Sequence, residues 1–176
     1  MKSICFLILF FSLVFNSCTA IYVNTDYDKH VDFSTYKTYA YDKTGIDKVE
    51  ISDLDKRRIL SAIDQQLLIK GFTKSSTPDI IITFFTKSNE QVNVSHVNFG
   101  WGYGWGWSPF VMGGTETMVT STTEGTLYID FIDAKRKEIF WHGEGTGVLS
   151  KDPIKKDQRI NEFVLKILMQ YPPKIK

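Results

Sequence analysis

The sequence predicts an α+β domain, in which a mainly antiparallel β-sheet carries two amphipathic helices packed on one face, in the order β-β-α-β-(loop)-β-β-α. Two observations lead to this prediction. Apolar and polar residues alternate over several segments, as is typical of half-buried strands, and two other segments repeat apolar residues every three or four positions, as is typical of helices. The sequence shows no internal repeat.

Two strands are expected early in this domain. Residues 20–25, AIYVNT, place Ile21 and Val23 on the same side of a strand. Residues 32–42, DFSTYKTYAYD, are rich in aromatic and β-branched side chains, which favour strands. The acidic residues 42–50 are then expected to form a connection.

The first helix is expected at residues 52–70. Ser52 suits the N-cap, Asp55 stands three residues later as in a capping box, and Gly71 suits the position just after the helix. The expected apolar stripe consists of Ile59, Leu60, Ile63, Leu67 and Leu68, while Lys56, Arg57, Asp64 and Gln65 are expected to face outward.

Strands and a second helix are expected in the C-terminal half. Residues 78–95 begin with an apolar run, which indicates a strand that is covered on both faces at its start. Residues 116–133 alternate, with Leu127, Ile129 and Phe131 on one face, and the segment DAKRK forms a turn to a partner strand at 138–150. The last helix has its apolar face at Ile160, Phe163, Val164, Ile167, Leu168 and Tyr171, and it ends before Pro172.

Residues 1–17 have the pattern of a lipoprotein signal peptide. Lys2 precedes an apolar run at 4–15 that is too short to cross a bilayer, which takes about 20 residues, and the segment FNSC then resembles a lipobox. Cys5 is lost with the leader, so Cys18 is left as the expected lipidation site and no intramolecular disulfide is expected. A plain secretory signal with a chance cysteine is the alternative.

Residues 18–176 are expected to form a single domain tethered at Cys18. Removing 17 of the 176 residues leaves 159, which is enough chain to bury a core without disulfides or metal. The remaining chain has 20 Lys plus Arg, because Lys2 is one of the 21, against 20 Asp plus Glu. This balance argues against nucleic acid as a partner, since the phosphate backbone requires a basic face.

Several phrases together resemble bacterial envelope lipoproteins of the domain-of-unknown-function family DUF4136. They are DFSTYKTYAY at 32–41, RRILSAIDQQLLIKGF at 57–72, PDIIITF at 78–84, the segment from GTLYIDFID to GTGVLS at 125–150, and the terminal YPP. The resemblance implies export, lipidation and an α+β fold. It supplies no catalytic residues.

The segment 98–114, NFGWGYGWGWSPFVMGG, is expected to be an insertion. It holds three of the four Trp and six of the twelve Gly, and an extended chain would place the aromatic residues at 99, 101, 103, 105 and 107 on one face. We interpret them as a candidate binding surface, the aromatic ladder, which comprises Phe99, Trp101, Tyr103, Trp105, Trp107 and Phe110. The ladder could contact a protein partner or a second copy, or a glycan or lipid surface, or the segment could be a loop without fixed structure.

Motifs for catalysis and for metal binding are weak. His30, His96 and His142 have no paired spacing, so no metal is expected, and no cofactor is expected either. Asp130, His142 and Glu144 could form an acid/base site on adjacent strands, although ordinary cross-strand partners are the preferred interpretation. The glycines of GEGTG do not open a helix and indicate a bulge or close backbone approach rather than a phosphate loop.

These observations favour a non-enzymatic function. The sequence predicts a lipoprotein of the cell envelope that is anchored through Cys18, expected on the outer membrane and facing the periplasm. We expect it to act as a binding or structural module, with an envelope protein or a second copy of the chain contacting the aromatic ladder. An enzyme that acts on envelope glycans or lipids is the alternative.

Overall fold

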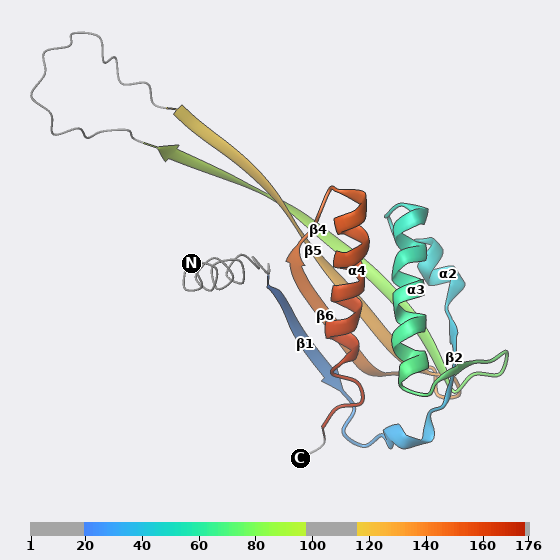
Figure 1. Cartoon of the computed structure of the whole chain (residues 1–176). Coiled ribbons are helices and arrows are strands. Elements are labelled where there is room, and N and C mark those ends of the chain that lie inside the picture. The colour runs from blue at the N-terminus through green and yellow to red at the C-terminus, as the bar shows by residue number, and fades with distance from the viewer. Residues whose placement is uncertain (1–19, 98–115, 175–176) are drawn as a thin grey trace, which may run out of the picture.

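Six strands in one sheet and three α-helices make up the part of the chain that the structure, a computed structural model, describes, residues 20–97 and 116–174. The fold is therefore α+β, as predicted. The elements are β1 (Ile21–Tyr27), the 3₁₀ helix η1 (Phe33–Thr35), β2 (Thr38–Tyr41), α2 (Lys43–Asp47), α3 (Asp53–Ile69), β3 (Thr73–Lys74), β4 (Ile80–Val97), β5 (Glu116–Asp133), β6 (Ile139–Val148) and α4 (Pro153–Leu168) (Figure 1).

The sheet is mixed, which corrects the prediction that it is mainly antiparallel. Its strand order is β1-β6-β5-β4-β2-β3. The pairs β1/β6, β6/β5 and β5/β4 are antiparallel, whereas β2 pairs in parallel with both β3 and β4. The parallel pairing arises because α3 lies between β2 and β4 in the chain, and a helical crossover brings the second strand back in the same direction as the first. The predicted order also omits α2 and β3.

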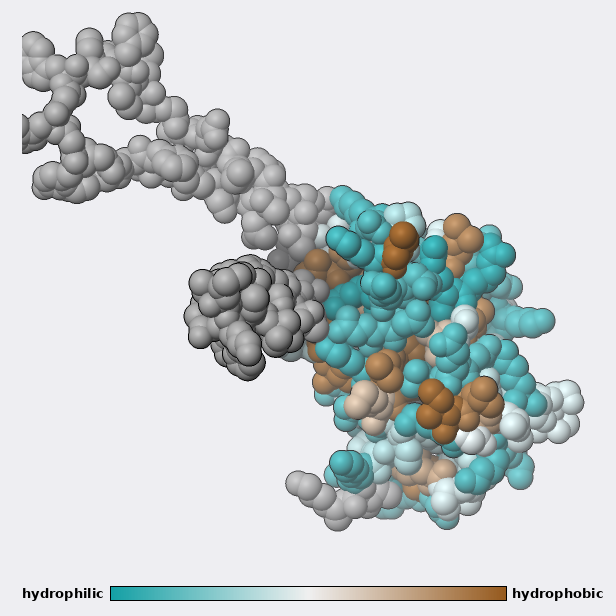
Figure 2. Space-filling view, in the orientation of Figure 1, coloured by the Kyte–Doolittle hydropathy of each residue, from teal (hydrophilic) through white to brown (hydrophobic). Residues whose placement is uncertain are grey.

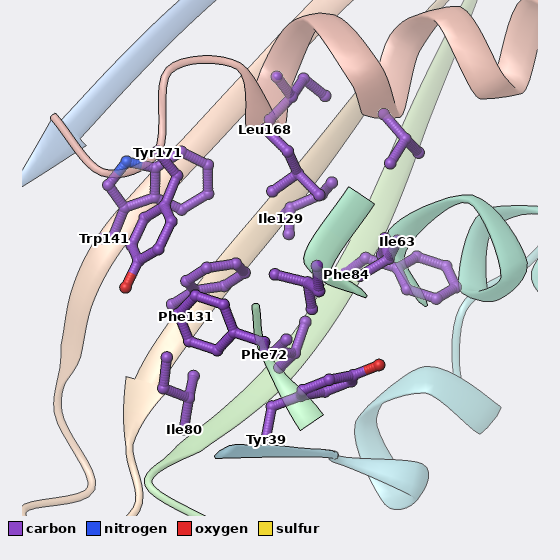
Figure 3. Packing of buried hydrophobic residues seen from close by; sticks show 14 of the residues in the cluster. Tyr39, Ile63, Phe72, Ile80, Phe84, Ile129, Phe131, Trp141, Leu168 and Tyr171 are labelled. Atoms are coloured by element: carbon purple, nitrogen blue, oxygen red, sulfur yellow. The ribbon is translucent and has the colours of Figure 1, made fainter. Parts of the chain in front are cut away.

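The hydrophobic core lies between the sheet and the pair α3 and α4, which both cover the same face (Figures 1 and 3). Alternate residues of β4 and β5 point into it, so that the predicted inner face of β5 is confirmed. The predicted apolar face of α4 is confirmed as well, because Ile160 packs against the core and the other five residues are buried in it. The outer surface of the two helices is mainly hydrophilic (Figure 2).

The first long helix has the predicted end signals, and the last has an N-cap that the sequence analysis did not identify. The Ser52 hydroxyl accepts a hydrogen bond from the Asp55 N–H (3.1 Å), and Gly71 follows α3 with a φ of 82°, a conformation that glycine adopts without strain. The Asp152 carboxylate accepts from the N–H groups of Ile154 and Lys155 and so caps α4. Side-chain capping therefore fixes where each helix begins.

Two local predictions are wrong. Within 32–42 only Thr38–Tyr41 is a strand, because the Asp32 carboxylate accepts from the Ser34 N–H and favours η1 instead. On α3 the predicted stripe is mostly confirmed, because Ile59, Ile63 and Leu67 are buried and Leu60 packs against the core. Leu68, however, is 70% exposed, and Asp64 points toward β2 rather than outward.

Asp64 points inward because polar groups surround its carboxylate there. It accepts hydrogen bonds from the hydroxyls of Tyr39 and Tyr41, at 2.8 and 2.7 Å, and pairs with the Lys74 ammonium. Burial acts to raise the pKa of Asp64, but the bonds from Lys74 and the two tyrosines outweigh it, and the pKa is lowered. The carboxylate thus links α3 to β2 and β3.

Three glycines of β6 form a stripe that faces α4. A Cβ on Gly143 would lie 2.5 Å from Ile167 Cγ2 and would also collide with the Trp141 ring. A Cβ on Gly145 would lie 2.9 Å from Ile167 Cδ1, and one on Gly147 would lie 2.9 Å from Arg159 Nη2. Of the two alternatives for GEGTG, a bulge or close backbone approach, the structure has the close approach, with α4 as the element that approaches.

This stripe predicts that Gly143→Ala destabilises the fold. The added methyl group would have to displace Ile167 or Trp141, which are both fully buried. We therefore expect the free energy of unfolding to fall by about 1–3 kcal/mol. Urea titration measures this change. Ser61→Ala on the exposed side of α3 is the control, with an expected change within about 0.5 kcal/mol. Equal stability of Gly143→Ala and the wild type would contradict the close packing.

Candidate functional site

The sheet face opposite α3 and α4 carries a row of stacked rings, which we call the ring row: Phe85 on β4, Tyr128 on β5 and His142 on β6. Phe85 and Tyr128 stack with centroids 4.4 Å apart and planes at 14°, and Tyr128 and His142 lie 5.7 Å apart at 29°. Phe85 is 42% exposed. The row crosses three strands, because alternate residues of each strand share this face.

His142 is held in place by a carboxylate. Asp130 lies opposite it in the β5/β6 register, and His142 Nδ1 is 2.5 Å from Asp130 Oδ1. Asp130 is buried, at 6% exposure, whereas the His142 side chain is 34% exposed. Such a pair fixes the imidazole and leaves Nε2 to exchange a proton with a neighbour or with solvent.

Glu144 shares this face with Asp130 and His142, as the sequence predicts. It lies opposite Tyr128 on β5 and Asn24 on β1. No bond from Glu144 to His142 is present, and among residues 20–97 and 116–174 only Asp130 hydrogen bonds to the His142 ring. The described residues thus bring an acid–base pair together.

The structure assembles no metal centre from the residues it describes. Within that part of the chain, no three His, Cys, Asp or Glu side chains gather where they could hold an ion. His30 is exposed, and its backbone N–H donates to the Asp28 carboxylate. The side chain of His96 lies outside the description.

A two-stranded ribbon extends from one end of the sheet (Figure 1). Strands β4 and β5 pair without interruption from Ile80↔Asp133 to Val97↔Glu116. Their last eight pairs, from Glu90↔Thr123 outward, have no third strand beside them in the described chain. At about 3.4 Å per residue, this ribbon is roughly 27 Å long.

The first strand begins at the same end of the sheet as the ribbon. Ile21 is in register with Gly147, Gly147 with Gly125, and Gly125 with Ser88. The start of β1 therefore lies at the same position along the sheet as the base of the ribbon. The helices α3 and α4 also begin at this end, where Lys156 Nζ pairs with Asp55 at 2.6 Å. We call it the ribbon end.

Arg159 ties the start of the described chain to this end. Its Nε donates to the Val148 carbonyl (2.9 Å) and its Nη2 to the Ala20 carbonyl (3.3 Å). Its Nη1 pairs with Glu162, and its guanidinium lies over the Phe163 ring. Because Arg159 is buried, at 8% exposure, these contacts join β1, β6 and α4 at one point.

The sequence-predicted site residues are only partly described. Cys18, the insertion at 98–114 and the aromatic ladder lie outside the described residues, although the ladder's neighbours Val97 and Glu116 are paired at the far end of the ribbon. Sequence reasoning missed the Phe85–Tyr128 stack and the Arg159 contacts. Only the alternation in β4 and β5 hinted at the first, and no local pattern indicated the second.

The predicted resemblance to DUF4136 is confirmed. The family model described as "Domain of unknown function (DUF4136)" matches residues 23–173, nearly the whole chain. No curated protein matches the chain in sequence. None of the described helices is both long enough and apolar enough to span a membrane.

Two solved structures are similar to this chain at low sequence identity. A PDZ domain protein from Parabacteroides distasonis is similar over 90% of this chain, with 19% identity and a TM-score of 0.54. The chain spans 37% of the length of that protein, and the similarity shows the fold alone. The PelC dodecamer from Paraburkholderia phytofirmans is similar over 85% of this chain and 95% of its own, with 11% identity and a TM-score of 0.48.

We predict that the Asp130–His142 pair contributes more to the stability of the fold than Glu144, its neighbour on the same face. His142→Ala would leave the buried Asp130 carboxylate without its partner, and we expect a loss of about 1–3 kcal/mol in the free energy of unfolding. Glu144→Ala, on the same face, is the control, with a change within about 0.5 kcal/mol. Chemical denaturation of both variants measures the difference, and equal losses would show that the pair contributes nothing specific.

Proposed function

The chain belongs to the DUF4136 family, and we propose that it acts as a lipid-anchored, non-catalytic binding module of the cell envelope, on the periplasmic side of the outer membrane. The observation that carries this proposal is the ribbon. For eight residue pairs the two strands continue with no third described strand beside them, and hairpins alone are marginally stable in water. Its unpaired edges also invite pairing with other chains. A partner that contacts the ribbon offsets both costs.

The position of the ladder in the sequence supports this function. The segment 98–115 joins Val97 to Glu116, so the ribbon carries the ladder at its far end. Tyr and Trp provide large contact areas at low entropic cost and are enriched in protein interfaces. We therefore propose the ladder as the contact surface for an envelope protein or a second copy of the chain.

Anchoring is supported by the leader and the position of Cys18. Two acyl chains hold a protein on a bilayer stably, whereas one holds it only marginally, and lipoproteins carry at least two. Only Thr19 separates Cys18 from Ala20, whose carbonyl Arg159 holds. A tether at Cys18 would therefore act directly on the folded domain.

We predict that Cys18→Ser releases the protein from the membrane fraction. The variant loses its acyl chains, and the described helices offer no span to replace them. Immunoblots of membrane and soluble fractions measure the distribution. Cys5→Ser, which changes the other cysteine of the chain, is the matched control and stays with the membrane. Retention of Cys18→Ser in the membrane fraction would refute the anchor.

We also predict that a photo-crosslinking residue at Tyr103 captures a specific partner in living cells. The same residue at Lys135, an exposed position in the β5–β6 turn at the opposite end of the sheet, is the control and captures none of it. Replacing Trp101, Trp105 and Trp107 by Ser in the Tyr103 background should abolish the product. An undiminished product in that background would exclude the ladder as the contact surface.

An enzyme that acts on envelope glycans or lipids is the second candidate. The Asp130–His142 hydrogen bond favours it, because His142 could transfer a proton through Nε2 while Asp130 orients the ring and Glu144 lies nearby. A folded variant with all three residues replaced by Ala tests it. A normal envelope phenotype in cells that carry this variant excludes the enzyme, whereas a null phenotype with normal crosslinking at Tyr103 supports it.

A further inference from the structure

We propose that the free edge of β4 binds an extended segment of a partner protein as an added strand, with an aromatic side chain of that segment packed against Phe85. We call residues 84–88 of β4 the binding edge. This site consists only of described residues and uses neither the aromatic ladder nor Cys18. It can therefore be tested separately from the proposed function.

The binding edge begins where β2 leaves the sheet. β2 pairs only with the first three residues of β4, and the Asp42 N–H then donates to the Ile82 carbonyl at 2.9 Å. Alternate residues of a strand direct their backbone groups to the same side, and the β4/β5 register is regular throughout. The N–H and C=O groups of Phe84, Thr86 and Ser88 therefore point away from β5. No described strand pairs with them, so they can accept an added strand.

A groove of about 420 Å³ adjoins the binding edge. One wall of the groove is β4 at residues 83–86, and the other wall lies in and just after α2 and consists of Gly45, Lys48, Val49 and Glu50. This volume is within the usual range of pockets for small ligands and is sufficient for one aromatic side chain. Because α2 closes the far side, an added strand would end at the groove and place only its last side chain there.

Phe85 favours an aromatic side chain as the occupant of this groove. Its ring stacks on Tyr128 of β5 at a centroid distance of 4.4 Å, yet the residue is 42% exposed and lines the groove. A strand at the binding edge would lie about 4.8 Å from β4 and place a side chain opposite Phe85 on the same sheet face. In an antiparallel strand this position is a non-hydrogen-bonded pair, in which side chains lie closest. A tyrosine or phenylalanine there would extend the ring row by one ring.

Lys87 adds a preference for an acidic residue in the partner. It follows Phe85 by two positions, so that both side chains lie on the same sheet face. Lys87 is exposed, and none of the ion pairs between described residues includes it. Opposite charges attract across paired strands. The proposed partner is therefore an extended segment in which an acidic residue stands two positions before an aromatic one.

Amide hydrogen exchange, measured by NMR on the full chain, tests this site with the capped peptide acetyl-TVTVDVY-amide. In the antiparallel arrangement the tyrosine of the peptide lies opposite Phe85 and its aspartate lies opposite Lys87. We expect the peptide to slow exchange of the Thr86 and Ser88 N–H groups by about tenfold or more, because these groups gain acceptors. The N–H groups of Phe85 and Lys87 point toward β5 and serve as controls in the same strand, with no expected change.

Altered peptides and protein variants test the individual contacts. N-methylation of the valines removes the backbone hydrogen bonds, and alanine in place of the tyrosine removes the ring, so each altered peptide should bind at least about fivefold more weakly. Lys87→Glu should weaken binding of the original peptide about fivefold, and a peptide with lysine in place of the aspartate should restore it. Lys135→Glu, in the distant β5–β6 turn, is the control and leaves binding unchanged. Stronger binding to Lys87→Ala would contradict the acidic partner, because lysines also protect strand edges from pairing.

Three results of the exchange experiment would overturn the proposal. Unchanged exchange at Thr86 and Ser88 with about 1 mM peptide would show that this edge does not bind a strand. Protection of the Ser121 N–H instead would place the peptide on the β5 edge of the ribbon. Slow exchange at Thr86 and Ser88 without peptide, increasing with protein concentration, would show that a second copy of the chain covers the edge. The crosslink at Tyr103 tests the ladder separately, so either surface can fail without the other.

Discussion

The close contact between α4 and the bare backbone of β6 is the constraint on which the rest of the structure depends. Gly143, Gly145 and Gly147 leave no side chain on this part of the sheet, so Ile167 and Phe163 lie directly against it. The same approach brings Arg159 within reach of the Ala20 and Val148 carbonyls. A helix held farther away by larger side chains would keep its apolar face but lose this junction, and β1 would no longer be joined to α4 through it.

This junction lies at the end of the domain where β1 starts and from which the ribbon extends. The two helices run parallel, with both N-termini beside the start of β1 and the base of the ribbon, and their C-termini are joined by a hydrogen bond from Lys70 Nζ to the Tyr171 carbonyl. The proposed tether and the proposed contact arm therefore leave the domain from the same end. An anchored domain in this arrangement would present its partner surface close to the membrane rather than deep in the periplasm.

Much of the fold follows from local sequence patterns, and the exceptions have physical causes. The inner faces of β5 and α4 and the caps at Ser52 and Asp152 depend on residues close together in the chain. The parallel pairing of β2 depends on a crossover, and the inward turn of Asp64 depends on tyrosines more than 20 residues away, which no local period records. For the site, alternation placed Asp130, His142 and Glu144 on one face. The Phe85–Tyr128 stack required the β4/β5 register, and the Arg159 junction required the approach of α4.

Energy transfer to a labelled bilayer tests most directly which end of the anchored domain lies nearer the membrane. A donor fluorophore is placed either at Glu116, at the far end of the ribbon, or at Lys135, in the turn at the opposite end of the sheet, and the acceptor is a headgroup-labelled lipid in vesicles that carry the lipidated protein. The account predicts markedly higher transfer efficiency from position 116 than from position 135. Equal transfer from both positions, or higher transfer from 135, would contradict it.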